Sequence, residues 1–126
     1  MAYYHSKTIE DAQFDAVIEK VTDALKDEGF GVLTDIDIRA TMKKKLDVDF
    51  RPYRILGACN PPYAFQALQA EDKIGTMLPC NVIVQEKNGG VEVAAVDPVA
   101  SMQAIENEAL GSIAGEIRDR LKRVVD

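Results

Sequence analysis

Residues 80–97 read Cys-Asn-Val-Ile-Val-Gln-Glu-Lys-Asn-Gly-Gly-Val-Glu-Val-Ala-Ala-Val-Asp, and this stretch is the strongest indication of the fold class. Two runs rich in β-branched residues, 80–86 and 91–97, have the composition of strands. Between them stands Asn88-Gly89, the pair that best adopts the left-handed conformations of a two-residue hairpin turn. The stretch therefore predicts an antiparallel hairpin.

Outward from the hairpin, helical and extended patterns alternate along the chain. We expect further strands at about 3–8, 30–38 and 51–59, and helices at about 10–28, 39–46, 60–70, 98–105 and 107–124. An antiparallel hairpin within such an alternating order favours an α+β domain, with helices on one face of a mixed or antiparallel sheet. No linker or repeat divides the chain, so residues 1–126 are expected to form one domain.

Local signals fix the expected ends and buried faces of the helices. Asn60 and Asp97 each precede a proline, which is typical of a helix N-cap. Thr8 with Asp11 is typical of a capping box at the start of a helix. Gly29 suits the left-handed residue that ends a helix. Helical spacing predicts that Met42, Leu46, Phe65 and Leu68 point inward. It also predicts one buried stripe on each of the two longest helices. The stripe in residues 10–28 is Phe14, Val17, Ile18, Val21 and Leu25, and the stripe in residues 107–124 is Leu110, Ile113, Ala114, Ile117, Leu121 and Val124.

Composition excludes several classes of protein. The chain has 126 residues, 47% of them hydrophobic, which supports a core without disulfides or a structural metal. Its net charge of −6 argues against a nucleic-acid-binding surface. No apolar run approaches the roughly 18 residues that span a membrane. The N-terminus lacks the pattern of a secretory signal, and only two cysteines are present, so we expect a cytoplasmic protein with free thiols.

Charge is distributed unevenly. Residues 10–28 hold seven acids against two lysines, which we interpret as a solvated helix face. A basic cluster follows, in which six cations outweigh two acids (Arg39, Lys43, Lys44, Lys45, Arg51 and Arg54 against Asp47 and Asp49). This cluster either forms a solvated surface or attracts a small anionic molecule.

Two similar phrases carry the strongest chemical signal. Gly-Ala-Cys-Asn-Pro-Pro occupies 57–62 and Leu-Pro-Cys-Asn-Val occupies 78–82, so a Cys-Asn pair stands at the end of one expected strand and the start of another. Cys59 also precedes a helix N-terminus, where a thiolate is stabilised. Paired thiols can form a reversible disulfide, bind a soft metal, or serve as nucleophile and resolving thiol. Alternatively, Cys59 and Cys80 are small buried hydrophobic residues.

Other catalytic signals are weak. The one histidine, His5, is either a third metal ligand, a base for a thiol, or an ordinary surface residue. The sequence contains no Gly-rich phosphate loop, and the 21-residue separation of the cysteines matches no standard metal motif.

Longer stretches of the chain resemble a known family. Gly29-Phe-Gly-Val-Leu-Thr-Asp-Ile-Asp37, Asp49-Phe-Arg-Pro-Tyr-Arg-Ile-Leu-Gly-Ala-Cys-Asn-Pro61, Leu78-Pro-Cys-Asn-Val-Ile-Val84 and Asp97-Pro98 are similar to the bacterial and archaeal "domain of unknown function 302". The resemblance implies a TATA-binding-protein-like fold with a curved antiparallel sheet, and a homodimer. It implies no activity, and fold alone transfers no DNA binding. The matching characteristic positions are Tyr53, Cys59, Asn60, Pro61, Pro79, Cys80 and Asn81.

Three functional hypotheses follow. The first is a dimeric module that binds a small ligand or a metal at a site made of Tyr53, Cys59, Asn60, Cys80 and Asn81, with the two cysteines as candidate metal ligands. The second is a thiol-dependent redox enzyme or carrier that uses the same cysteines. The third is a structural or regulatory dimer in which the asparagines only shape turns. We expect Cys59 and Cys80 to lie within about 10 Å of each other, with Cys80 the more buried.

Overall fold

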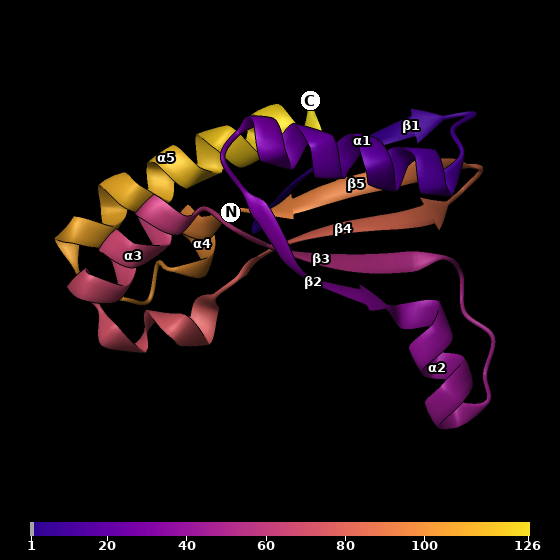
Figure 1. The fold of residues 1–126 in the computed structure, drawn as a ribbon, viewed down its shortest axis with the longest axis horizontal. Coiled ribbons are helices and arrows are strands. Elements are labelled where there is room, and N and C mark those ends of the chain that lie inside the picture. Colours follow the sequence, from indigo (N-terminus) through magenta and orange to yellow (C-terminus); the bar gives the residue numbers. More distant parts are fainter. Residues whose placement is uncertain (1) are drawn as a thin grey trace.

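In a computed structural model that describes residues 2–126, the chain forms a single α+β domain built on one five-stranded antiparallel sheet (Figure 1). The strands lie in the order β1-β5-β4-β3-β2. Their bounds are β1 Tyr4–Glu10, β2 Gly31–Asp37, β3 Tyr53–Cys59, β4 Cys80–Lys87 and β5 Gly90–Val96. The expected fold class is therefore confirmed, and β1 and β2 form the two edges of the sheet.

Two long helices cover one face of this sheet (Figure 1). They are α1 (Phe14–Asp27) and α5 (Glu108–Val125). Their buried stripes meet alternate strand residues in a shared core, which includes Leu25 and Leu121 on the helices and Leu56, Val82 and Val93 on the strands. Alternation is expected, because successive side chains of a strand point to opposite faces.

The local signals that predicted these elements are mostly confirmed. Asn88 and Gly89 both have positive φ, at 53° and 81°, as the β4–β5 hairpin requires. Asp97 caps the short helix α4 (Pro98–Ser101) by accepting from the Val99 N–H at 2.9 Å. Gly29, with φ of 87°, ends α1. The expected capping box is wrong, because Thr8 and Asp11 precede α1, whose N-cap Gln13 makes no side-chain bond.

Two predicted buried faces are also wrong. Helix α2 (Ile38–Leu46) buries no residue: Met42 is half-buried and Leu46 is 66% exposed, because the main contacts of α2 within the described residues are with β2 and β3 at the edge of the sheet. In α3 (Pro61–Ala70), Phe65 is 64% exposed and Leu68 44%, while Ala67 turns inward. Spacing along a helix identifies a stripe but does not identify what covers it.

Helix α3 and the segment after it complete the domain at one end of the sheet. A 3₁₀ helix, η1 (Asp72–Met77), connects α3 to β4 and was not predicted from the sequence. A small second core of Ala67, Ile74 and Leu110 joins α3, η1 and α5. This end of the molecule holds the candidate site.

Candidate functional site

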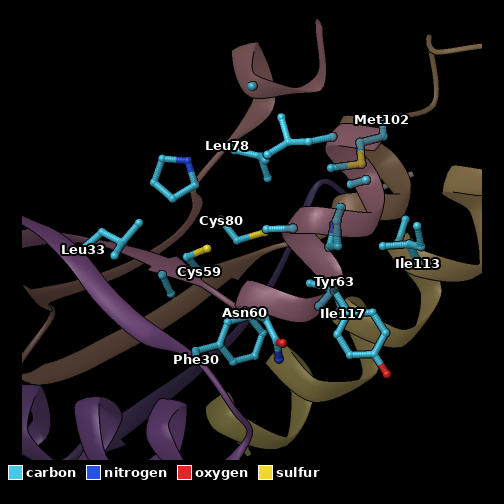
Figure 2. Close-up of a pocket in the computed structure, with 18 residues that line it drawn as sticks. Phe30, Leu33, Cys59, Asn60, Tyr63, Leu78, Cys80, Met102, Ile113 and Ile117 are labelled. Carbon is cyan, nitrogen blue, oxygen red and sulfur yellow. The ribbon is translucent and has the colours of Figure 1, made fainter. Parts of the chain in front are cut away.

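The candidate site is an apolar cavity of about 330 Å³ at the junction of β3, β4, α3 and α5 (Figure 2). Its lining is almost wholly hydrophobic, apart from the two thiols, the Asn60 amide and the Tyr63 ring. The lining residues are Phe30, Leu33, Ala58, Cys59, Asn60, Tyr63, Ala64, Ala67, Leu68, Gly75, Leu78, Pro79, Cys80, Pro98, Met102, Ile113, Ala114 and Ile117. A volume in this range accommodates a small organic molecule.

The sheet register brings the two cysteines to this cavity. Ala58 is the antiparallel partner of Cys80, and Cys59 is the next residue along β3. Adding a cross-strand step of about 5.5 Å to one chain step of about 3.8 Å puts the two Cα atoms less than about 10 Å apart. Figure 2 shows both sulfur atoms beside the same space.

Cys80 is the more buried of the two thiols, with 7% of its surface exposed. Burial, with a smaller contribution from the nearby Cys59, raises the pKa of Cys80 to about 11. An apolar wall disfavours the charged thiolate, so Cys80 is a neutral thiol at neutral pH. It therefore behaves in the cavity as a small hydrophobic side chain.

Cys59 is half-buried and stands just before helix α3. A helix start stabilises a thiolate through free backbone N–H groups. Here the first two helical positions are Pro61 and Pro62, which have no N–H, and the Ala64 N–H is bonded to the Asn60 carbonyl. The helix therefore offers Cys59 fewer donors than the sequence pattern predicted.

Asn60 has a structural role that the sequence did not predict. It holds the N-cap position of α3, but its side chain makes no bond to that helix. Instead, Nδ2 donates to the main-chain carbonyl of Glu28 at 3.2 Å, at the end of α1. Arg120 Nη1 donates to the same oxygen at 2.9 Å, and the Arg120 guanidinium lies over the Tyr63 ring at 5.4 Å. These contacts fix one wall of the cavity.

Tyr53 and Asn81 do not reach the cavity. Tyr53 begins β3, six residues before Cys59, which corresponds to roughly 20 Å along a strand. Asn81 follows Cys80 in β4 and therefore points to the opposite face, where it is exposed. Tyr53 and Asn81 instead border a separate hollow on the sheet face away from α1 and α5. Of the five candidate residues, three therefore line the cavity, namely Cys59, Asn60 and Cys80.

The remaining sequence candidates lie elsewhere. His5 Nε2 contacts Asp126 Oδ1 at 2.8 Å, which links β1 to the C-terminal residue. Within the expected basic cluster, Arg54 pairs with Asp35, Lys43 with Asp47, and Arg51 Nε donates to Gln85. Among residues 2–126, no group of three His, Cys, Asp or Glu side chains is arranged to hold a metal ion.

The sequence did not identify the residues that close the cavity from its C-terminal side. Met102, Ile113 and Ile117 come from the C-terminal part of the chain, and Leu78 from the segment after η1. The predicted apolar stripe of α5 was the available signal for Ile113 and Ile117. That stripe is typical of any core helix, so it did not distinguish a cavity wall from ordinary packing.

Together these features define a small α+β protein with an apolar, ligand-sized cavity at the end of its sheet. The chain belongs to the family described as "Domain of unknown function DUF302", which matches residues 5–126. It is similar to a solved structure, the crystal structure of the uncharacterized conserved protein DUF302 from Bacillus stearothermophilus. The two share 29% identity with a TM-score of 0.93, over 100% of this chain and 98% of the other.

No curated protein matches the chain. Among the described residues, none of the helices combines the length and the apolar character needed to cross a bilayer.

Proposed function

We propose that this protein binds a small, largely apolar molecule in the cavity between β3, β4, α3 and α5. The observation that carries the proposal is the lining, which is almost wholly hydrophobic around a space of about 330 Å³. Transfer of an apolar ligand into such a space is favourable by about 25 cal/mol of free energy for each Å² of apolar surface that is removed from water.

The charges around the cavity favour a neutral ligand. Cys80 is a neutral thiol at neutral pH because burial raises its pKa to about 11. The Asn60 amide is already bonded to the Glu28 carbonyl, and Arg120 donates to that same carbonyl. No charged side chain lines the cavity, so an anionic or cationic group inside it would lack a partner.

Reversible thiol chemistry is a second candidate, because Cys59 and Cys80 border the same cavity. A disulfide requires Cα atoms within about 7 Å and converging Cβ vectors. Ala58, and not Cys59, is the cross-strand partner of Cys80, so the two thiols are not a directly opposed pair, and both are free in this structure. We therefore rank this function below ligand binding.

A soft metal remains the weakest of the alternatives. Two thiols are available, and the part of the chain that the structure describes adds no third residue of the usual ligand types. Soft-metal sites in proteins commonly recruit additional sulfur or imidazole ligands. The proposal is therefore confined to an organic ligand.

Titration with a neutral, polarity-sensitive naphthalene dye tests the proposal. We expect one dye molecule to bind each chain, with increased fluorescence. Ala64→Phe fills the cavity from α3 and should weaken dye binding at least about tenfold, which is about 1.4 kcal/mol. Gln66→Phe adds a similar ring at an exposed position of the same helix and serves as the control. Equal dye affinity in the two folded variants would contradict the proposal.

A further inference from the structure

The side chains that line the cavity include few hydrogen-bonding groups, and one of them bears on the chemistry of the ligand. The two thiols are weak donors and weak acceptors. The Tyr63 hydroxyl both donates and accepts, so it does not select one kind of polar group over another. The Asn60 amide is the remaining polar side-chain group, and Figure 2 shows it on the same side of the cavity as Phe30 and Tyr63. The orientation of this amide therefore determines which polar group of a ligand it can meet.

The Asn60 amide is held in one orientation by the end of α1. Its Nδ2 donates to the Glu28 carbonyl at 3.2 Å, and the same carbonyl accepts from Arg120 Nη1 at 2.9 Å. A rotated amide would place Oδ1 against that carbonyl, so that two acceptors would face each other without a hydrogen between them. The nitrogen of Asn60 is therefore committed to Glu28, and the oxygen is the group that remains for a ligand.

Asn60 Oδ1 has no hydrogen-bond donor among residues 2–126, although only 6% of the residue is exposed. No fully enclosed side-chain nitrogen or oxygen of these residues lacks a partner, so Oδ1 still contacts open space. The hollow that Asn60 borders is the cavity. A ligand that covered this oxygen with apolar surface would leave it unpaired and away from water, which costs free energy. A ligand that supplies a donor is therefore favoured.

We propose that the ligand is a neutral, largely apolar molecule that carries a hydroxyl or N–H group and donates it to Asn60 Oδ1. This inference rests on the proposed function, because it names the chemical class of the ligand in the same cavity. Phenols, alcohols and indoles belong to this class, whereas ethers, ketones and hydrocarbons have no such hydrogen to donate. A protonated amine is also disfavoured, because no carboxylate lines the cavity to pair with its charge.

Two probes of similar shape test the inference. The first, 1-naphthol, carries a hydroxyl group, and in the second, 1-methoxynaphthalene, a methyl group replaces the hydroxyl hydrogen. Each probe is titrated against the protein in complex with the naphthalene dye, and displacement of the dye gives the affinity of the probe. We expect the unchanged protein to bind 1-naphthol about tenfold more tightly than 1-methoxynaphthalene, because only the naphthol satisfies Oδ1.

Two variants separate the hydrogen bond from the general shape of the cavity. Asn60→Ala removes Oδ1 and should reduce the affinity ratio of the two probes to about one, chiefly by weakening the binding of naphthol. Arg120→Ala removes the other donor to Glu28 and so loosens the same junction of helices, but it keeps Oδ1. It should therefore retain the tenfold ratio even if both affinities fall. Circular dichroism and urea unfolding establish that each variant is folded before the titration.

A measurement on the unchanged protein tests the same contact without any variant. A hydrogen bond to Oδ1 polarises the amide, so 1-naphthol should shift the NMR signals of the Asn60 side-chain NH₂ group more than 1-methoxynaphthalene does. Equal affinity for the two probes, a preference for naphthol that survives Asn60→Ala, or equal NMR shifts with both probes would overturn the inference while leaving cavity binding intact. Binding of neither probe would refute the proposed function, and the inference with it.

Discussion

Asn60 donates a hydrogen bond from Nδ2 to the main-chain carbonyl of Glu28, 3.2 Å away, and so joins the start of α3 to the end of α1. Arg120 of α5 donates to the same carbonyl at 2.9 Å. The last carbonyls of a helix have no partner within it, so donors from elsewhere must satisfy them. Three helices therefore converge on one oxygen beside the cavity.

This shared acceptor predicts non-additive stability effects. Asn60→Ala alone should lower the free energy of unfolding by about 1 kcal/mol, because Arg120 still satisfies the carbonyl. Asn60→Ala combined with Arg120→Ala removes both donors and should cost roughly 1 kcal/mol more than the sum of the single changes. Urea unfolding of the four proteins measures this coupling. Strictly additive effects would show that the two bonds act independently.

Gly57 is predicted to be intolerant of a larger residue. A Cβ at this position would meet Thr34 Oγ1 and come within 2.8 Å of Pro79 Cγ, so the side chains of Thr34 and Pro79 would have to shift. Gly57→Ala should therefore lower the free energy of unfolding by about 1–3 kcal/mol. Gly31→Ala is a matched strand control, since nothing lies within 4 Å of its Cβ. Similar thermal unfolding midpoints for both variants would contradict the close packing around Gly57.

Stability should depend on Cys80 at high pH. Burial raises the pKa of this thiol from 9.0 to about 11 in the folded protein, so the unfolded chain ionises first as the pH rises. The contribution of Cys80 to the free energy of unfolding is fully present below about pH 9. This contribution decreases by about 2–3 kcal/mol as the pH rises from 9 to 11. Chemical unfolding between pH 8 and 11 should show a steeper decline for the unchanged protein than for Cys80→Ala. Parallel pH profiles would contradict the burial of an ionisable thiol.

The two thiols should differ in reactivity. Cys59 is half-buried, whereas Cys80 is buried and held neutral by its surroundings, so an alkylating reagent should modify Cys59 first. Mass spectrometry of the partially labelled native protein identifies the modified residue, and Cys59→Ser should remove the faster phase. Equal, slow labelling of both thiols before unfolding would rule out thiol chemistry in the native protein and leave the ligand-binding proposal unaffected.

Much of the architecture was predictable because local chemistry determined it. Asn88-Gly89 specifies the hairpin turn, and Asp97 before Pro98 specifies a helix start, since each depends only on neighbouring backbone geometry. The buried faces of α2 and α3 were not predictable in this way. Helical spacing indicated an inward Leu46 and Phe65, but burial depends on the elements that pack against them, and none of the described part of the chain covers them.

The candidate site was predictable only in part for a related reason. Asn81 was grouped with Cys80 because the two are adjacent in sequence, yet adjacent strand residues face opposite sides of the sheet. Cys59 and Cys80 come to one cavity through a strand register that the sequence does not reveal. The walls formed by Met102 and Ile113 depend on how the C-terminal segment returns over α3, which only the folded structure displays.

Methyl NMR during titration with a neutral apolar probe tests the ligand-binding claim most directly. We expect saturable shifts of the methyl signals of Leu78, Ile113 and Ile117, whose side chains line the cavity, with little change for Ile55 and Ile83 on the opposite sheet face. Shifts confined to Ile55 and Ile83, or no saturable shift in the cavity methyls, would contradict the claim that this cavity is the binding site.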